Sequence, residues 1–224
     1  MGFTHPANQV TLRLSKRAVP TYRCAMTSEI LIALIGFAFA SSITPGPNNL
    51  MLMASGANYG LPRTIPHMLG ISLGHAFMVT MVGVVLLQVF ETYPSVNVVL
   101  KVLSAAYMTW LAWKIANAVP PEAREVTGTP FTFLQAAAFQ WVNPKAWFMA
   151  ITAISAYAPQ DRGVVIGSLM VALVFAAVNL PSVTVWALTG VQVRRWLGTA
   201  RRLRTFNVLM AALLVLSLYP ILMQ

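Results

Sequence analysis

The chain has 224 residues, of which 58% are hydrophobic and 9% are charged, and its mean hydropathy is +0.70. A soluble domain of this length is not so apolar, so the composition indicates an integral membrane protein. A net charge of +10 would suggest a nucleic-acid partner in a soluble protein. In a membrane protein, basic loops set the orientation instead, so we expect no nucleic acid. The single cysteine, Cys24, excludes a disulfide framework or a cysteine metal cluster.

Residues 1–25 are polar and basic, and they contain no apolar core of the kind that a signal peptide requires. Met26 directly precedes the first apolar segment. The first 25 residues are therefore either the product of a misassigned start or a basic N-terminal extension, and the sequence leaves both open. Residues 26–224 are expected to form a single transmembrane transporter domain.

Six apolar segments follow Met26, and each is bounded by proline, glycine or charged residues. A helix of roughly 20 apolar residues crosses the hydrocarbon core of a bilayer. The sequence therefore predicts an all-α membrane protein with six transmembrane helices. They cover residues 29–56, 65–90, 95–117, 131–158, 163–190 and 205–223.

Basic residues alternate between the loops of this prediction. The loops after the first, third and fifth segments carry most of them, whereas the other two carry only Lys101 and Arg162. Because positive charge is retained in the cytoplasm, both termini are predicted to lie outside it. The basic extension argues for the opposite orientation, a conflict that disappears if the chain begins at Met26.

The first and fourth segments are each interrupted near the middle by helix-breaking residues. The first reads Thr44, Pro45, Gly46, Pro47, Asn48, Asn49, and the fourth reads Gln140, Trp141, Val142, Asn143, Pro144, Lys145. Proline removes a backbone donor and clashes with the preceding turn, so helical hydrogen bonding must fail at both places. Unpaired backbone groups are costly in lipid, and such a break must be buried in protein or line a wet cavity.

The two halves of the chain are predicted to be inverted repeats, about 26–118 and 130–224. Each contains three segments and a broken first one, and an odd number of crossings makes the second copy enter from the opposite side. Each half also has a GxxxG spacing, which permits close helix packing. These glycines are Gly70 and Gly74 in the first half and Gly163 and Gly167 in the second.

Paired broken helices are the sequence signal of a transporter site near the bilayer midplane. The predicted substrate-binding residues are Thr44, Pro45, Gly46, Pro47, Asn48, Asn49, Asn143, Pro144 and Lys145. Lys145 is an intramembrane cation that could hold a substrate carboxylate, and the asparagines suit a zwitterion. The alternatives are that the prolines merely kink helices, that Lys145 reaches an interface, and that the asparagines satisfy freed backbone groups.

Two ionisable residues are candidates for proton coupling. His75 lies inside the second segment and could titrate near neutral pH, although a structural histidine bonded to a carbonyl is the stronger interpretation. Glu29 lies at the start of the first segment, and no acidic residue lies deep in any segment. Asn179 and Pro181 form a milder break in the fifth segment, which we interpret as a proline kink.

The motif from Ser42 to Asn49, the glycine pair before His75, and Asn143-Pro144-Lys145 resemble the LysE/RhtB amino-acid exporter family over nearly everything after Met26. The resemblance implies a bacterial inner-membrane protein that exports amino acids or close derivatives, in exchange for protons. Residues 105–114 and 140–145 are most similar to the branch that exports cysteine and O-acetylserine. Homoserine, threonine and leucine remain open as substrates.

Two other function classes are alternatives to export. An intramembrane enzyme would need a catalytic dyad or a metal cluster, and an ion or metal permease would need carboxylates or cysteines at membrane depth. The apolar segments contain neither. We therefore expect a transporter that is not an enzyme, with no metal site and no cofactor. Its expected partners are the amino-acid substrate, the lipid bilayer and, as an open possibility, a second copy of the chain.

Overall fold

The computed structural model describes residues 26–86, 92, 95–118, 129–159, 161–217 and 219. Within these ranges the chain is helical and contains no strand, which confirms the predicted all-α class. The prediction of a basic extension at 1–25 lies outside the described residues. In chain order the elements are α1 (Ser28–Ile43), α2 (Pro47–Tyr59), α3 (Leu61–Met81), the π-helix η1 (Val82–Leu86), α5 (Ser95–Ala116), α6 (Phe133–Phe139), the 3-10 helix η2 (Gln140–Val142), α7 (Pro144–Tyr157), α8 (Val164–Leu197) and α9 (Ala200–Leu216).

The first apolar segment is divided into α1 and α2, whose axes differ by 55°. Thr44 is extended, with φ −63° and ψ 142°, because the residue before a proline is disfavoured in the helical region. Pro47 then begins α2, a position where its missing N–H would have no partner in any case. The proline pair thus ends one helix and starts the next.

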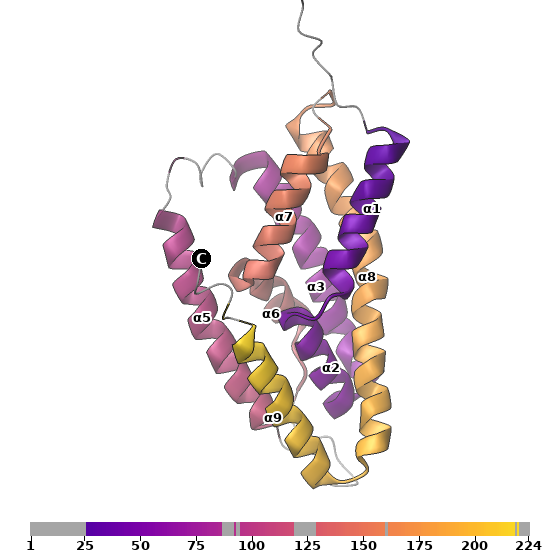
Figure 1. Cartoon of the computed structure of the whole chain (residues 1–224), viewed down its shortest axis with the longest axis vertical. Helices are drawn as coiled ribbons and strands as arrows, with labels where there is room; N and C mark the ends of the chain where they lie inside the picture. Colours follow the sequence, from indigo (N-terminus) through magenta and orange to yellow (C-terminus); the bar gives the residue numbers. More distant parts are fainter. Residues whose placement is uncertain are drawn as a thin grey trace, which may run out of the picture.

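The fourth segment is interrupted in the same manner. α6 begins with a capping box between Thr132 and Gln135, and the chain then tightens into η2. Asn143 is extended, with φ −96° and ψ 107°, and its side chain caps α7, which begins at Pro144. Figure 1 shows both interruptions near the middle of the long axis of the molecule.

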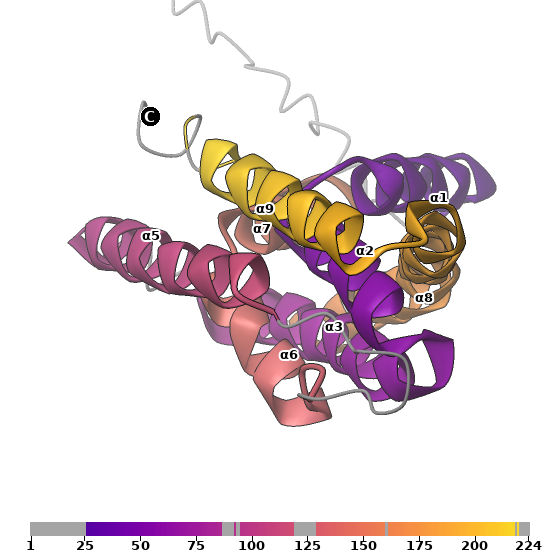
Figure 2. The same cartoon turned by 90° about the horizontal axis from the view of Figure 1, so that it is seen from below.

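Helix α8 is the longest element and packs against α1, α2 and α3, while α5 packs against α9 (Figure 2). The α2–α8 contact depends on two glycines. A Cβ on Gly56 would collide with the Ala187 carbonyl, and a Cβ on Gly190 would collide with the Met53 carbonyl. The two backbones therefore lie in direct contact, as small residues allow in membranes.

We expect Gly56→Leu and Gly190→Leu to lower the thermal unfolding temperature in detergent, because each side chain must push two helices apart. Overpacking costs about 1–3 kcal/mol, and more where backbone must move. Gly36→Leu is the matched control, since Gly36 is exposed and a Cβ there meets no described atom within 4 Å. Unchanged unfolding temperatures for both Gly56→Leu and Gly190→Leu would contradict the close α2–α8 contact.

The other glycines selected from the sequence have different roles. A Cβ on Gly70 would collide with the carbonyl of Phe133, the first residue of α6, and one on Gly74 would lie 2.6 Å from Ala137 Cα. Gly167 approaches Pro159 equally closely. The packing role predicted for Gly163 is wrong, because this residue caps α8 with φ 78° and its Cβ would meet no described atom within 4 Å. Glycine is needed there for the turn.

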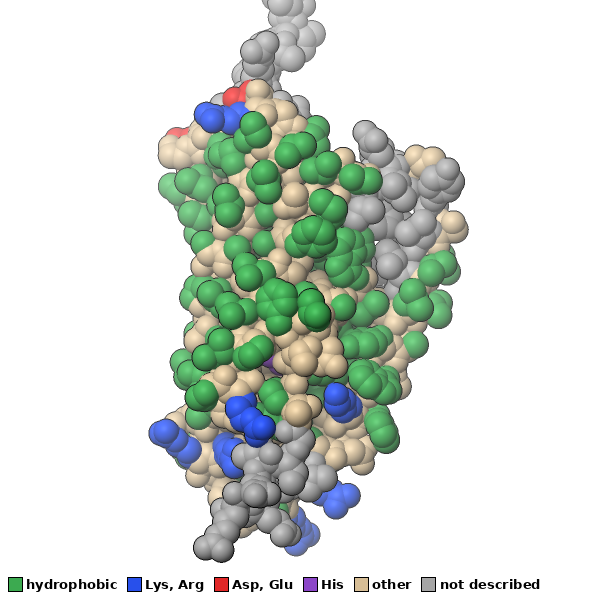
Figure 3. Space-filling model, turned by 180° about the vertical axis from the view of Figure 1, so that it is seen from behind, with side chains coloured by type: hydrophobic (Ala, Val, Ile, Leu, Met, Phe, Trp, Pro, Cys, Tyr) green, Lys and Arg blue, Asp and Glu red, His purple; other side chains and the backbone are tan. Residues whose placement is uncertain are grey.

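On the face shown in Figure 3, hydrophobic side chains cover the middle and charged side chains gather toward the ends. Large hydrophobic side chains that are 57–74% exposed include Ile32, Phe77, Leu134 and Leu173. Such exposure is unfavourable in water and favourable in lipid. Within the described chain, two helical stretches, Leu61–Val85 and Val164–Leu197, are long and apolar enough to cross a membrane, and the bent α1–α2 pair makes a third. The interrupted α6–α7 pair is divided into pieces too short to cross alone. The six-helix inverted repeat stays a prediction.

Candidate functional site

The two interruptions lie together at one polar cavity, which we call the central cavity. The empty space in it, including space open to its surroundings, is about 320 Å³. α1, α2, α3, α7 and α8 contribute side chains to it, and so does the residue between η2 and α7. The lining residues are Ser41, Ser42, Gly46, Asn48, Asn49, His75, Asn143, Lys145, Ala146, Met149, Asn179 and Val183. Residues about one hundred positions apart in the sequence therefore share one site.

Five of the nine predicted substrate-binding residues line the central cavity: Gly46, Asn48, Asn49, Asn143 and Lys145. Thr44, Pro45, Pro47 and Pro144 are not among its lining residues. The three prolines determine where the half-helices end and begin. Thr44 contributes its carbonyl, while its hydroxyl bonds back to the Ala40 carbonyl of α1.

Lys145 joins the two breaks. Its ammonium Nζ donates to the Thr44 carbonyl at 2.7 Å and lies 3.5 Å from the Pro45 carbonyl. The last carbonyls of a helix have no partner within it and carry its negative dipole end. A cation from the first turn of α7 thus caps the end of α1 across the cavity. Lys145 is only half-buried, so its remaining N–H groups have room for a further acceptor.

Asn49 and Asn143 hydrogen-bond to backbone groups next to the two helix breaks. Asn49 Nδ2 donates to the carbonyls of Ser42 at 2.8 Å and Thr44 at 2.7 Å. Asn143 Oδ1 accepts from the backbone N–H of Lys145 at 3.2 Å. These contacts match the alternative in which asparagines satisfy groups freed by the prolines. The Thr44 carbonyl therefore has two donors, Asn49 and Lys145.

Asn179 has greater significance than the sequence suggested. It lies on α8, is buried, and donates from Nδ2 to Ser42 Oγ at 3.1 Å. Its Oδ1 has no hydrogen-bond partner among the described residues. The kink interpretation missed this free acceptor in the cavity; the available signal was a single amide within a long apolar run.

Asn48 and Gln140 form a reciprocal amide pair between the two halves of the chain. Asn48 Nδ2 donates to Gln140 Oε1 at 2.9 Å, and Gln140 Nε2 donates to Asn48 Oδ1 at 3.2 Å. Gln140 is fully buried and donates further to the Ala136 carbonyl at 2.9 Å. It belongs to the second helix-breaking motif, yet it was not among the predicted site residues.

We expect Asn48→Leu and Gln140→Leu each to destabilise the protein by about 1–3 kcal/mol, because each leaves the other amide of the pair without its partner. The double variant is expected to lose less stability than the sum of the losses in the two single variants. Unfolding in detergent measures this coupling, which is typically about 0.5–3 kcal/mol for residues in contact. Strictly additive losses would show that the pair is not coupled.

The two candidate proton carriers lie apart. His75 is buried in the central cavity wall, with Nε2 3.3 Å from the Ala146 carbonyl, and its Nδ1 has no partner in the described structure. Glu29 is exposed in the first turn of α1, roughly 20 Å along that helix from Ser42. The structure therefore brings His75, and not Glu29, to the cavity.

The lining residues of the central cavity present the Lys145 ammonium, the free Asn179 amide oxygen, the unpartnered His75 Nδ1 and no carboxylate. Among the described residues, no group of three His, Cys, Asp or Glu side chains could hold a metal ion. This donor set suits an organic solute that carries an acceptor for Lys145 and a donor for Asn179. Fold and site together define a multi-pass helical membrane protein whose polar groups gather where two helices are interrupted.

The chain belongs to the LysE type translocator family, whose sequence model matches residues 39–217. It is therefore a transporter and not an enzyme. It is similar to the cysteine/O-acetylserine efflux protein of Klebsiella pneumoniae, with 31% identity over 85% of this chain and 95% of the relative. The efflux proteins of the same name from Salmonella paratyphi A and Escherichia coli K12 are 31% and 29% identical, each over 85% of this chain and 96% of the relative. No solved structure matches the chain.

Proposed function

We propose that this protein exports amino acids or close derivatives, with cysteine and O-acetylserine as the first candidates, across the inner membrane of a bacterium. The observation that carries the proposal is the ammonium of Lys145 at the meeting point of two helix breaks, in the same cavity as the free Oδ1 of Asn179. An α-carboxylate suits the first group, and an α-ammonium suits the second. The efflux relatives support this substrate class.

Transport proceeds by alternating access, in which the two halves move about the central cavity. Positive-inside bias places the end that carries Arg63, Lys114 and the α8–α9 arginines in the cytoplasm. Figure 3 shows most Lys and Arg side chains gathered at that end of the face in view. The substrate then enters from the basic end and leaves past the α1 N-terminus.

Export is tested in cells that make the full chain and are fed dipeptides, which raise the internal level of each amino acid. We expect cysteine or O-acetylserine to accumulate outside faster than from cells with an empty vector. Serine and alanine are matched probes that share the backbone and lack the thiol or acetyl group. Release equal to the empty vector for every solute would refute export.

His75 is the proposed proton carrier, because it is the titratable imidazole in the central cavity. We expect His75→Gln to retain downhill substrate exchange in proteoliposomes, since glutamine can still bond the Ala146 carbonyl. Acceleration by an imposed pH gradient is expected to disappear. Glu29→Gln is the control and should keep that acceleration. A full pH-gradient response in His75→Gln would exclude His75 as the carrier.

A further inference from the structure

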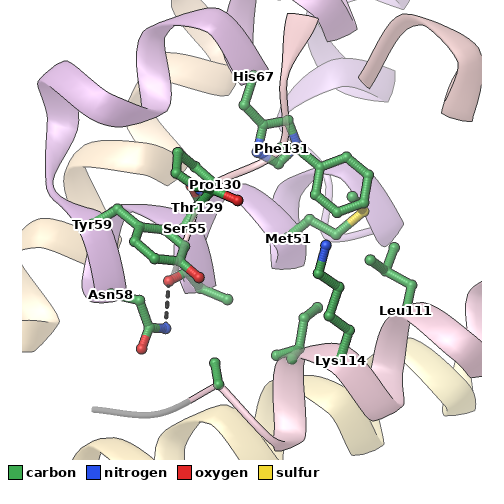
Figure 4. A pocket seen from close by; sticks show the side chains of 13 residues that line it. Met51, Ser55, Asn58, Tyr59, His67, Leu111, Lys114, Thr129, Pro130 and Phe131 are labelled. Atoms are coloured by element: carbon green, nitrogen blue, oxygen red, sulfur yellow. Dashed lines mark hydrogen bonds between the residues drawn. The ribbon is translucent and has the colours of Figure 1, made fainter. Parts of the chain in front are cut away.

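A second cavity lies nearer the basic end of the molecule, between α2, α3, α5 and the chain that leads into α6 (Figure 4). The empty space in it, including space open to its surroundings, is about 430 Å³. We call it the lower cavity and define it by Met51, Ser55, His67, Leu111, Lys114 and Phe131. It shares no lining residue with the central cavity.

His67 is the buried side chain of this cavity that lacks hydrogen-bond partners. The side chain is 1% exposed, and neither ring nitrogen has a hydrogen-bond partner among the described residues. Its ring stacks on Phe131, with the two centroids 5.3 Å apart. An imidazole without a partner is costly to bury, because it must donate from one nitrogen and accept at the other.

The other buried polar side chains around the lower cavity are satisfied. Ser55 and Thr64 bond to each other through their hydroxyls at 2.9 Å. Asn58 and Asn207 form a reciprocal amide pair at 2.8 and 3.1 Å. His67 therefore differs from the other buried polar side chains around the cavity, which have hydrogen-bond partners within the protein. This difference points to a ligand as the missing partner of His67.

Lys114 supplies a charge near Phe131, the ring that His67 contacts. Its ammonium lies 5.3 Å from the centroid of Phe131, the ring on which His67 stacks, and 5.4 Å from that of Trp110. Figure 4 shows the ammonium pointing toward Phe131 and Met51. No Asp or Glu is among the described residues that line the cavity, and most of its wall is apolar. A positive, mostly apolar pocket with a free imidazole suits a small carboxylate with an apolar body.

The lower cavity is aligned with the central cavity along two helices. Asn48, which lines the central cavity, shares a face of α2 with Met51, Ser55 and Asn58, because they are spaced by three and four residues. On α3, His67 and His75 lie eight residues apart on one face, a rise of roughly 12 Å. Asn48 lies one turn before Met51 on α2 and is hydrogen-bonded to the buried Gln140.

We propose that the lower cavity is a second substrate site, which holds the carboxylate of the amino acid between Lys114 and His67 before it reaches the central cavity. The inference rests on the proposed function for the identity of the ligand. It adds a second binding position nearer the basic end, one turn of α2 beyond Asn48.

Ring-nitrogen NMR of the full-length protein in detergent tests this site, because the chain has only three histidines. His67→Gln and His75→Gln assign the two buried resonances by deleting them. The probe is O-acetylserine, and the amide of O-acetylserine, which lacks only the carboxylate, is its control. We expect O-acetylserine to shift the His67 resonance and its amide to leave the resonance in place.

Variants separate the two sites. In Lys145→Met the His67 shift should persist, while the His75 shift is lost. In Lys114→Met the concentration for half of the His67 shift should rise roughly tenfold, and Lys114→Arg should restore it. A His67 resonance that stays in place while His75 shifts would overturn the second site and leave the proposed function intact. If neither resonance moves and cells export nothing, the proposed function fails as well.

Discussion

Replacing Lys145 by methionine is expected to reduce export at least roughly tenfold, which is the effect of losing one charge-assisted contact to a carboxylate. Methionine keeps much of the length and apolar stem of lysine but removes the ammonium. The fold should survive, because the Thr44 carbonyl keeps Asn49 as its donor at 2.7 Å. Initial rates of O-acetylserine efflux from preloaded proteoliposomes measure the loss.

Two controls accompany Lys145→Met. Arg162→Met removes an exposed cation in the turn before α8 and should leave efflux unchanged. The unfolding temperature of Lys145→Met should remain within a few degrees of that of the parent protein. Efflux at the parent rate in a well-folded Lys145→Met protein would remove Lys145 from the substrate site.

Gly46→Ala is expected to disable the same lysine without replacing it. Gly46 is extended, with φ −178°, so alanine fits the backbone. A Cβ there would lie 2.8 Å from Lys145 Cδ and 3.0 Å from its Nζ. The flexible end of Lys145 must therefore leave its place on the Thr44 carbonyl, and we expect export to fall roughly tenfold while the protein stays folded.

A double-variant cycle distinguishes this cause from a general defect. In a Lys145→Ala background, Gly46→Ala should cause no further loss of efflux, because the side chain that it displaces is gone. Gly36→Ala makes the same chemical change on α1 where a Cβ meets no described atom within 4 Å, and should be neutral. Equal losses from Gly46→Ala in both backgrounds would contradict the proposed contact.

The helix breaks could be predicted because proline and glycine act locally. Pro45, Pro47 and Pro144 fix where helices end and begin, whatever surrounds them. Lys145 was predictable for a similar reason, since a cation in an apolar segment requires a polar setting.

Contacts across the fold could not be predicted from the sequence. Whether Asn179 faces lipid, another helix or a cavity depends on the rotation of α8, which a long apolar segment does not specify. The role of Gln140 depends on its hydrogen bond to Asn48, which lies 92 residues away in the sequence. The spacing of Gly163 and Gly167 resembled a packing motif, yet α8 begins only after Gly163, and helix boundaries are poorly defined by pattern.

Thiol protection at position 41 tests directly whether the two breaks enclose one substrate pocket. Ser41 lines the central cavity, and Cys24 is the single native cysteine. The protein for this test therefore carries Cys24→Ser and Ser41→Cys. We predict that a small methanethiosulfonate reagent labels the introduced thiol in proteoliposomes, and that O-acetylserine slows the labelling at concentrations that saturate efflux. Labelling at the same rate with and without saturating substrate would contradict the pocket.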